Sequence, residues 1–569
     1  AKKFPTLRFT QKVSVGKPPE ERARILVANM TLEEKASLCS GLDFWHTKPI
    51  DRLGIPSMMM CDGPHGLRKQ DSATDHLGLN GSVPATCFPT AAGLANSWDE
   101  ALLERVGTAI GKEAAAEGVS IVLGPGCNIK RNPLCGRNFE YFSEDPFLSG
   151  KSAAAMIRGI QSNGISACVK HFAANSQELR RMSNDSVLDE RTLREIYLPS
   201  FETAVKEGGV KCLMTSYNQL NGTYTNENMH LLRDILRNDW GYNGMVVTDW
   251  GGNNDRVAGL LAGDDLEMPC SGGETDRHIV EAVKNGSLSE DVLNESVDRI
   301  LTLLYDTRRH SMNKYCNKLS HHALAQEFAA ETAVLLKNDG VLPLTKKNHV
   351  AIIGDFAKDP RYQGAGSSLV NSTKLENAVS ALRAEDLNLI GYAQGYKRQG
   401  GRSQKLLSGA CELAIHSDTV LLFLGLDEGS EAEGLDREHM RLPENQLELL
   451  NALSSIHGNI IVILSCGGAV EMPWADRCTA IVHGYLNGQA GALAMAKLLC
   501  GKKNFSGKLS ETIPMRYEDC PSAPYYPGKE ATSEYREGIF VGYRYFDKAG
   551  VEPLFPFGYG LSYTTFAYS

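Results

Sequence analysis

Asp249 follows an apolar, β-branched run and stands directly before an aromatic residue and two glycines in the segment Gly244–Gly252, GMVVTDWGG. A short run of this kind is typical of a buried parallel strand, and α/β enzymes place their chemistry at the carboxyl ends of such strands. A buried carboxylate costs free energy unless it is paired or used. Taken alone, this aspartate is more simply explained as a helix cap or turn residue. Further polar clusters elsewhere in the chain make a functional role for Asp249 the better explanation.

Four more groups of charged and aromatic residues stand where other strands of the first half are expected to end. Each residue alone is more often part of a turn, an ion pair or a buried core, but their shared position at strand ends is hard to explain by chance. Carboxylates accept hydrogen bonds from sugar hydroxyls, whereas Arg, Lys and His donate to hydroxyl oxygens, so the set predicts a site for a polyhydroxylated ligand. An aromatic wall is expected from Trp250 or Trp45. The groups contribute Asp62 and Arg68 (DGPHGLR), Arg137 (GRNFEY), Lys170 and His171 (KHF), and Tyr217 (TSYN).

Eight segments, in order along the chain, resemble glycoside hydrolase family 3 in its β-glucosidase branch. They are DGPHGLR, GRNFEY, KHFAANSQE, TSYN, VVTDWGG, EGLDRE, GIFVGYRYFD and FPFGYGLSYTTF. The resemblance runs from about Thr31 to the end of the sequence and implies a hydrolase with no metal and no other cofactor. It also implies that Asp249 is the catalytic nucleophile.

The same resemblance implies a sugar-binding subsite built by the first domain. Arg181 is preferred to Arg180 on spacing alone, and Trp250 is expected to form a wall. The loop Gly364–Ser368 is expected to close the pocket through Ser368, although a lone GxG there is too weak to indicate a nucleotide site. The sugar-binding residues that the resemblance implies are Asp62, Arg68, Arg137, Lys170, His171, Arg181 and Tyr217. Trp250, as the aromatic wall, and Ser368, in the neighbouring loop, are added to this set from the sequence itself.

Hydrolysis with retention requires a second carboxyl group, which protonates the leaving oxygen and later activates water. By the resemblance it lies in the second domain, after the run Val420–Leu424, in the acidic loop GLDEGSEAEGLDR. The family motif selects Glu433, with Glu431 and Glu428 as reserve candidates, and a solvated acidic loop is the alternative. We expect the negative charge of this loop to keep Glu433 protonated. Leu435 replaces the aromatic residue usual in the family, which bears on contacts with the leaving group.

We therefore expect a retaining, exo-acting β-glucosidase that removes terminal β-D-glucose from oligosaccharides or from aryl and alkyl glucosides. A β-xylosidase or another β-glycosidase of the family is the alternative. A sugar-binding protein without activity is a further alternative, but it predicts loss of Asp249 or of the acidic loop, and both are present. A metal-dependent hydrolase is disfavoured because the histidines show no HxH or HExxH pattern. The N-acetylglucosaminidase branch is disfavoured by Ala173–Asn175 after KHF and by the full second domain.

Alternating strand-like and helix-like segments must position these residues. Strand-like runs at 119–123, 165–170, 211–216 and 245–248, with a helical pattern at 189–205, predict a (β/α)8-type barrel over residues 1–306. A doubly wound sheet is the structural alternative, because its local pattern is the same.

The rest of the chain divides into three further segments. A polar, basic interval predicts a linker at 307–323, and renewed alternation predicts an α/β sandwich domain over 324–536. The segment 537–569, rich in Tyr, Phe and Gly and without helical period, is expected to be a ribbon that packs across domains. Members of this branch frequently continue into a fibronectin-III-like domain at this point.

Composition limits the partners. With 42% hydrophobic residues the chain has the composition of a soluble globular protein, and its net charge of −9 argues against nucleic acid and anionic membrane. The expected partner is a small β-glucoside or oligosaccharide, and a homo-oligomer is left open. The fourteen cysteines form no CxxC pair, which favours free thiols. Residues 1–8 lack an apolar signal core, so we expect a cytoplasmic protein unless a signal was removed.

Overall fold

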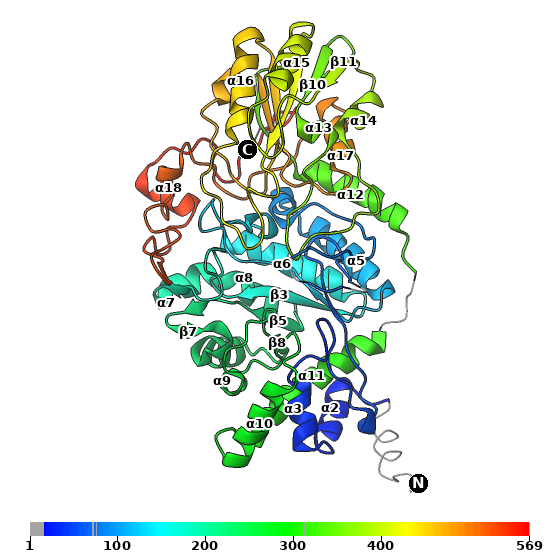
Figure 1. The fold of residues 1–569 in the computed structure, drawn as a ribbon, viewed down its shortest axis with the longest axis vertical. Coiled ribbons are helices and arrows are strands. Elements are labelled where there is room, and N and C mark those ends of the chain that lie inside the picture. Colours follow the sequence, from blue (N-terminus) through cyan, green and yellow to red (C-terminus); the bar gives the residue numbers. More distant parts are fainter. Residues whose placement is uncertain (1–15, 71–72, 76, 311–314, 568–569) are drawn as a thin grey trace.

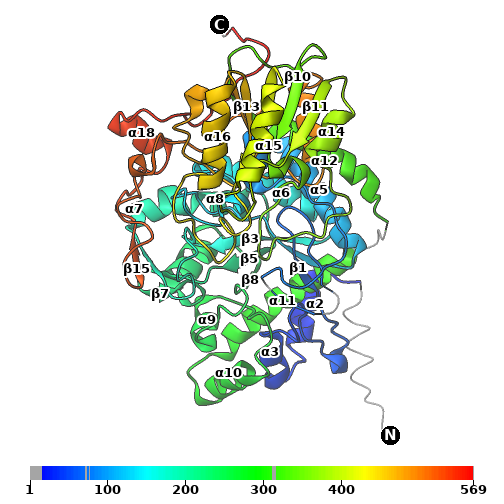
Figure 2. The ribbon, with the colours of Figure 1, turned by 45° about the horizontal axis from the view of Figure 1, so that its top comes forward.

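The computed structural model of the chain describes residues 16–70, 73–75, 77–310 and 315–567. The N-terminal segment on which the localisation prediction rests lies outside these residues. Two α/β units lie one above the other along the long axis, with the N-terminal unit below and residues from α12 onward mainly above (Figure 1). Figure 2 shows the edge strand β11 of the upper unit and its neighbour β10 on the side away from the C-terminal helix α18.

The lower unit is built on a five-stranded parallel sheet of order β1-β2-β3-β5-β8. Every residue of these strands is buried, as the near-continuous apolar runs of the sequence predict for parallel strands covered on both faces. The strands are β1 (Met60–Asp62), β2 (Ile121–Leu123), β3 (Ser166–Phe172), β5 (Cys212–Thr215) and β8 (Met245–Val247).

Single bridges carry the pairing from β8 back to β1. Val247 pairs with Leu266, Glu267 with Ser40, Gly41 with Thr47, and His46 with Met59, next to β1. The hydrogen-bonded circuit therefore returns to its first strand, which a doubly wound open sheet does not do. The expectation of a barrel-type α/β fold is confirmed, with part of the wall formed by single bridges instead of full strands.

Helices cover the outside of this sheet. A capping box begins α3, where Thr31 accepts a hydrogen bond from Glu34 N–H and the Glu34 carboxylate accepts one from Thr31 N–H. Asp99 caps α5 and Asp145 caps α6 in the same way through their side chains. The longer helices are α2 (Pro19–Val27), α3 (Leu32–Leu38), α5 (Glu100–Ala116), α6 (Pro146–Gln161), α8 (Pro199–Lys206), α9 (Arg256–Ala262), α10 (Glu274–Asn285) and α11 (Glu290–His310).

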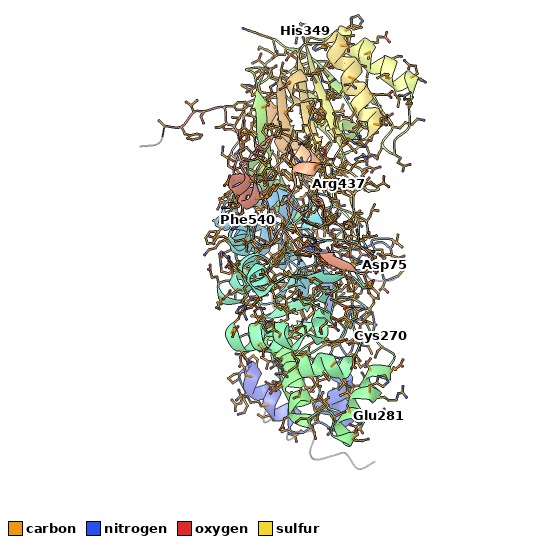
Figure 3. The ribbon with its side chains drawn as sticks, turned by 90° about the vertical axis from the view of Figure 1, so that its left-hand side faces the viewer. Asp75, Cys270, Glu281, His349, Arg437 and Phe540 are labelled. Carbon is orange, nitrogen blue, oxygen red and sulfur yellow. The ribbon has the colours of Figure 1, made fainter. Side chains whose placement is uncertain are left out.

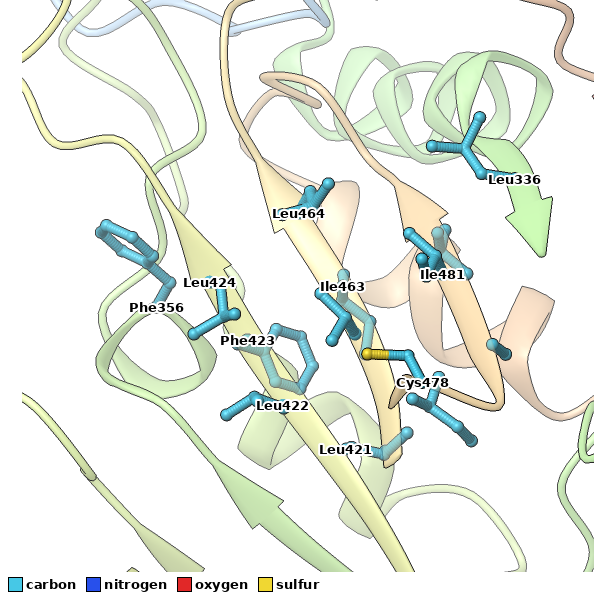
Figure 4. Close-up of a cluster of buried hydrophobic side chains, with 14 of the residues drawn as sticks. Leu336, Phe356, Leu421, Leu422, Phe423, Leu424, Ile463, Leu464, Cys478 and Ile481 are labelled. Atoms are coloured by element: carbon cyan, nitrogen blue, oxygen red, sulfur yellow. The ribbon is translucent and has the colours of Figure 1, made fainter. Parts of the chain in front are cut away.

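The upper unit is a six-stranded sheet of order β11-β10-β12-β13-β14-β9, parallel except for the edge strand β9. Branched aliphatic residues such as Leu422, Ile463 and Ile481 fill the space between sheet and helices (Figure 4). The strands are β9 (Val334–Asn338), β10 (His349–Ile353), β11 (Asn388–Ala393), β12 (Thr419–Gly425), β13 (Ile460–Ser465) and β14 (Ala480–His483). The helices are α12 (Lys318–Thr332), α13 (Asp355–Lys358), α14 (Ala378–Arg383), α15 (Gln404–Ile415), α16 (Glu444–Ile456) and α17 (Gly491–Leu499). The expected α/β layered unit is confirmed.

The interval predicted as a linker is helical at both described ends. α11 continues to His310 and α12 begins at Lys318, so the polar composition of 307–323 did not stop either helix. Polar residues continue a helix readily where one face is still buried, as Leu303 and Leu304 are on α11. The linker at 307–323 and the division of the chain into domains at 306 and 324 stay predictions, and both described ends of the interval are helical.

The C-terminal segment lies against both units, as expected for a connecting ribbon. Tyr543 N–H donates to Glu144 of the lower unit, and Leu561 bridges to Leu335 of the upper unit. One expectation is wrong: the segment contains a helix, α18 (Tyr543–Ala549), bounded by Gly542 and Gly550, whose positive φ angles suit glycine.

Two further features of the fold concern the cysteines, which were predicted to be free thiols, and the lengths of the apolar helices. Each of the fourteen cysteines, all within the described residues, is a free thiol, and most are buried like small hydrophobic side chains. None of the described helices combines the length and apolarity that crossing a bilayer requires.

Candidate active site

Asp249 lies just beyond the end of β8, where the sequence placed it. Its Oδ1 accepts a hydrogen bond of 2.7 Å from Trp250 N–H, whereas its Oδ2 has no hydrogen-bond partner among the described residues. The nearest basic group is His171, with Nε2 3.7 Å from Oδ2. Burial raises the pKa of Asp249, and the charges of Arg137 and Arg181 oppose that rise. One oxygen of this buried carboxylate thus makes no hydrogen bond to the described residues.

Asp62, at the end of β1, lies in a buried network with two cations. Its Oδ2 accepts a hydrogen bond of 3.1 Å from Arg68 Nη1, and Lys170 Nζ lies 4.0 Å from its Oδ1. Burial raises the pKa of Asp62 to about 6, although Lys170 and Arg68 favour its charged form. Arg68 is held on its other side by Asp75, at 3.1 Å, at the edge of the lower unit (Figure 3).

Glu140 joins two of the predicted sugar-binding residues and was not predicted. It lies 2.7 Å from Arg137 Nη2 and 3.4 Å from Lys170 Nζ. Burial would raise the pKa of Glu140, but Arg137 and then Lys170 outweigh burial and lower it. A carboxylate between two buried cations fixes both side chains. Its position inside the GRNFEY segment was the available signal.

His171 is oriented by Tyr141, a second residue that was not predicted. The Tyr141 hydroxyl lies 3.1 Å from His171 Nδ1, and Nε2 points toward Asp249. Burial, with the charges of Arg137 and Lys170, lowers the pKa of His171 well below its ordinary value. The imidazole is therefore neutral near pH 7 and forms no ion pair with the nucleophile candidate.

Tyr217 and Trp250 form one wall of the cluster. The Tyr217 hydroxyl donates to the Trp250 carbonyl at 2.7 Å, and Trp250 Nε1–H donates to the Phe44 carbonyl at 2.8 Å. Trp45, the other aromatic candidate, packs behind Trp250 with ring centroids 5.6 Å apart. The Arg181 guanidinium lies 4.9 Å from the Tyr217 ring centroid.

Glu433 reaches this cluster from the loop between β12 and α16 of the upper unit. Its Oε1 accepts a hydrogen bond of 2.9 Å from Arg181 Nη1 and lies 3.5 Å from Arg137 Nη1. Its Oε2 accepts one of 2.7 Å from Ser367 N–H. The side chain is only 6% exposed. Of the two neighbouring arginines between which the sequence left a choice, Arg181 is the one that contacts Glu433. Arg180 donates instead to the Gly528 carbonyl.

The charge around Glu433 is the opposite of what the acidic loop predicted. Burial would raise the pKa of Glu433, but Arg137 and Arg181, with the Ser367 hydrogen bond, lower it well below the ordinary value. The reserve candidates turn away from the cluster: Glu431 accepts from Gly467 N–H at 2.5 Å, and Glu428 lies 3.4 Å from Arg398. The loop acids therefore do not keep Glu433 protonated in the unliganded protein.

The loop Gly364–Ser368 wraps around Glu433. Gly366, at φ +114°, lies so close that a Cβ there would be 2.4 Å from Glu433 Cβ. Ser367 supplies the backbone contact, whereas the predicted residue Ser368 is buried with an Oγ for which the described residues offer no hydrogen-bond partner. Ser368 is thus brought near the cluster without touching Glu433, and its hydroxyl is free for a ligand.

Two carboxylates fasten the Glu433 loop to the lower unit, and neither was predicted. Asp436 accepts backbone N–H hydrogen bonds from Gly136, Glu178 and Leu179, at 2.9–3.1 Å. In return, Glu178 accepts one of 2.7 Å from Gly434 N–H and one of 2.9 Å from Arg181. Pairs of residues so far apart in the sequence leave no local pattern. Arg437 next to them lies at the junction between the units (Figure 3).

Comparison with known families and proteins follows the same division of the chain. Residues 26–303 match the N-terminal domain model of glycosyl hydrolase family 3, and residues 333–563 match its C-terminal domain model. Thermostable β-glucosidase B of Acetivibrio thermocellus is 54% identical over 550 residues, covering 96% of this chain and 73% of that protein. An exo-α-(1→6)-L-arabinopyranosidase of Bifidobacterium longum is 43% identical over 555 residues, covering 95% of this chain and 73% of that protein.

Solved structures are similar over the same length. A family 3 β-glucosidase of Bifidobacterium adolescentis is 44% identical with a TM-score of 0.90, over 95% of this chain and 78% of that one. β-Glucosidase 3B of Thermotoga neapolitana, in complex with glucose, is 34% identical with a TM-score of 0.87, over 96% of this chain and 83% of that one. The chain belongs to glycoside hydrolase family 3.

Proposed function

We propose that this glycoside hydrolase is a retaining, exo-acting β-glucosidase in which Asp249 is the nucleophile and Glu433 the acid/base. One observation carries the proposal: Asp249 of the lower unit and Glu433 of the upper unit share the arginines Arg137 and Arg181. Glu433 contacts both arginines directly, their charges act on Asp249, and Asp249 has one oxygen without a hydrogen-bond partner among the described residues. Retention requires two carboxyl groups about 5–5.5 Å apart across the scissile bond. The relatives named β-glucosidases support the choice of substrate.

The reaction begins with sugar binding in the lower unit. Asp62 accepts hydrogen bonds from hydroxyl groups far from the anomeric carbon, Arg68 and Lys170 donate to the oxygens of other hydroxyl groups, and neutral His171 can donate or accept. The free hydroxyl of Ser368 and the wall of Trp250 complete the subsite. Asp249 Oδ2 then lies free to attack the anomeric carbon and form the covalent glycosyl intermediate.

Glu433 must carry a proton in the first step. The sugar hydroxyls take hydrogen bonds from Arg137 and Arg181, which releases the Glu433 carboxylate from these two cations. Burial and the nearby negative charge of Asp249 then raise the pKa of Glu433, because both disfavour a second charge. After Asp249 becomes an ester, that negative charge is gone, so the pKa of Glu433 falls and the carboxylate serves as the base that activates water.

A mechanism-based trap tests the assignment of the nucleophile. A 2-deoxy-2-fluoro-β-glucoside with a good leaving group should label Asp249, found by peptide mass spectrometry, and Asp249→Asn should remain folded and take no label. Turnover should fall by at least about 10⁴-fold in Asp249→Asn, because the covalent route is lost. A label on any other residue would overturn the proposal.

An α-L-arabinopyranosidase is the second candidate. It is favoured by the relative of that name in Bifidobacterium longum, which matches this chain over 95% of its length. The arabinopyranose ring lacks the C6 hydroxymethyl group, so it offers Asp62 and Arg68 fewer hydrogen bonds. Comparing kcat/KM for nitrophenyl β-D-glucopyranoside and α-L-arabinopyranoside decides between the two.

A further inference from the structure

A second cluster of chemically reactive side chains lies outside the active site. It consists of Glu113 on α5, Cys316 before the start of α12, and His321 in the first turn of α12. One potential ligand atom from each residue lies within 4.8 Å of the others. His321 Nδ1 is 2.7 Å from Glu113 Oε1, and Cys316 Sγ is 3.7 Å from Nδ1 and 3.9 Å from Nε2.

The surrounding structure holds these side chains in place. Glu113 and His321 are 2% and 4% exposed. The second carboxylate oxygen of Glu113 accepts a hydrogen bond of 3.0 Å from Thr86 N–H, which fixes the orientation of the group. Asn317 caps α12 by accepting from Leu319 and Ser320 N–H, and this cap sets the turn between Cys316 and His321. Cys316 is partly exposed, so a small ion reaches the cluster from solvent.

The ligand types select the ion. A thiolate, an imidazole and a carboxylate are the ligands of Zn²⁺, whereas Ca²⁺ and Mg²⁺ prefer sets made only of oxygen. For a tetrahedral ion with bonds of about 2.0–2.3 Å, neighbouring ligand atoms lie about 3.3–3.6 Å apart. The sulfur lies 3.7 Å from Nδ1 and 3.9 Å from Nε2, beside the ring, so a rotation of the Cys316 side chain is needed to bring the thiolate and Nδ1 onto one ion. The carboxylate–imidazole distance lengthens by about 0.5 Å when the metal replaces the proton that the two groups share.

We propose that Glu113, Cys316 and His321 bind one Zn²⁺ ion, with water in the fourth position. The thiolate and carboxylate balance the charge of the ion, and the open position faces the exposed side of Cys316. The ion joins α5 of the lower unit to the segment that leads into α12 and the upper unit. It stabilises this connection and takes no part in hydrolysis, because none of its ligands contacts the active-site cluster.

Cobalt substitution of the full-length, metal-free protein tests the proposal. Co²⁺ bound tetrahedrally by a thiolate gives an intense sulfur-to-cobalt charge-transfer band in the near ultraviolet. We expect one Co²⁺ per chain with this band, and its loss on adding one equivalent of Zn²⁺. Cys316→Ser should abolish the band, while Cys270→Ser should keep it, since Cys270 is an exposed thiol elsewhere on the lower unit (Figure 3).

Thermal unfolding supplies an independent readout. Zn²⁺ binding to the folded state should raise Tm in the wild type and in Cys270→Ser, but not in Cys316→Ser. Cys316→Ser should retain wild-type hydrolysis of a nitrophenyl glucoside, which shows that it is folded. A wild-type protein without the charge-transfer band, or a Cys316→Ser protein that keeps the band, would overturn the proposal.

Discussion

At the scale of single residues, Asp249 and Asp62 are both buried carboxylates, but their partners differ. Asp249 leaves one oxygen free, whereas Asp62 is paired with Arg68 and lies near Lys170. An oxygen without a partner suits a nucleophile, and a paired carboxylate suits the recognition of hydroxyl groups. The hydrogen bonds that each side chain makes therefore support the two different roles proposed for them.

The Asp62→Ala substitution should lower kcat/KM for glucosides much more than for xylosides. If Asp62 binds a hydroxyl that the xyloside lacks or holds less firmly, kcat/KM for the glucoside should fall by at least about 100-fold more, because a buried partner is left unpaired. The measurement compares nitrophenyl β-glucoside with β-xyloside. Equal losses on both substrates would contradict the role given to Asp62.

On the acidic side of the pH profile, kcat/KM should begin to fall at a pH above the ordinary pKa range of aspartate. Both Asp249 and Asp62 must be ionised, and burial raises the pKa of Asp249 and moves that of Asp62 to about 6. A carboxyl group with a raised pKa keeps its proton to higher pH, so kcat/KM falls as the pH drops through that raised value. A profile that stays flat down to about pH 4, near the ordinary pKa of aspartate, would contradict this expectation.

At the scale of elements, the loop between β12 and α16 brings Glu433 to the barrel, and two carboxylates hold it there. Asp436 of the loop accepts hydrogen bonds from three backbone N–H groups of the lower unit, and Glu178 of the lower unit accepts one from Gly434 N–H. The contacts are reciprocal, so each unit supplies the acceptor for donors of the other. The position of Glu433 depends on both.

Asp436→Ala should impair acid catalysis more than sugar binding. Removing the carboxylate leaves three N–H groups without their acceptor, at about 1–3 kcal/mol for each one that stays buried, and frees the Glu433 loop. kcat should fall more for alkyl glucosides, which need protonation, than for dinitrophenyl glucosides, which do not. Glu438→Ala, in an exposed neighbouring acid, is the matched control. Equal losses for both leaving groups would show that the clamp does not position Glu433.

The sequence predicted elements better than their electrostatic surroundings. The strands that carry Asp62, Lys170 and Asp249 are strong apolar runs, so their ends could be located. The prediction of an acidic environment for Glu433 was wrong because neighbours in the sequence need not be neighbours in space. Glu431 and Glu428 contact groups of the upper unit, whereas Arg137 and Arg181 of the barrel lie next to Glu433. Glu140 was missed because its role depends on cations that meet only in the fold.

At the scale of the whole molecule, the proposed active site draws on both units. The barrel supplies Asp249 and the sugar-binding cluster, and the upper unit supplies Glu433. The C-terminal ribbon reinforces the junction, since Glu537 pairs with Arg131 and Glu144 accepts hydrogen bonds from both Thr512 and Tyr543. Under the proposed assignment, catalysis depends on the way the units are held together. The eight ordered motifs pointed to this arrangement because they come from both units.

The central claim is that Glu433 is the acid/base paired with Asp249, and chemical rescue of Glu433→Ala tests it most directly. Dinitrophenyl glucoside should still glycosylate Asp249, alkyl glucosides should stall, and deglycosylation should slow because no base activates water. Added azide needs no base, so it should restore turnover and yield β-glucosyl azide. Rescue in Glu433→Ala but not in Glu431→Ala is the predicted result. Activity at the wild-type level in Glu433→Ala, or azide rescue only in Glu431→Ala, would contradict the claim.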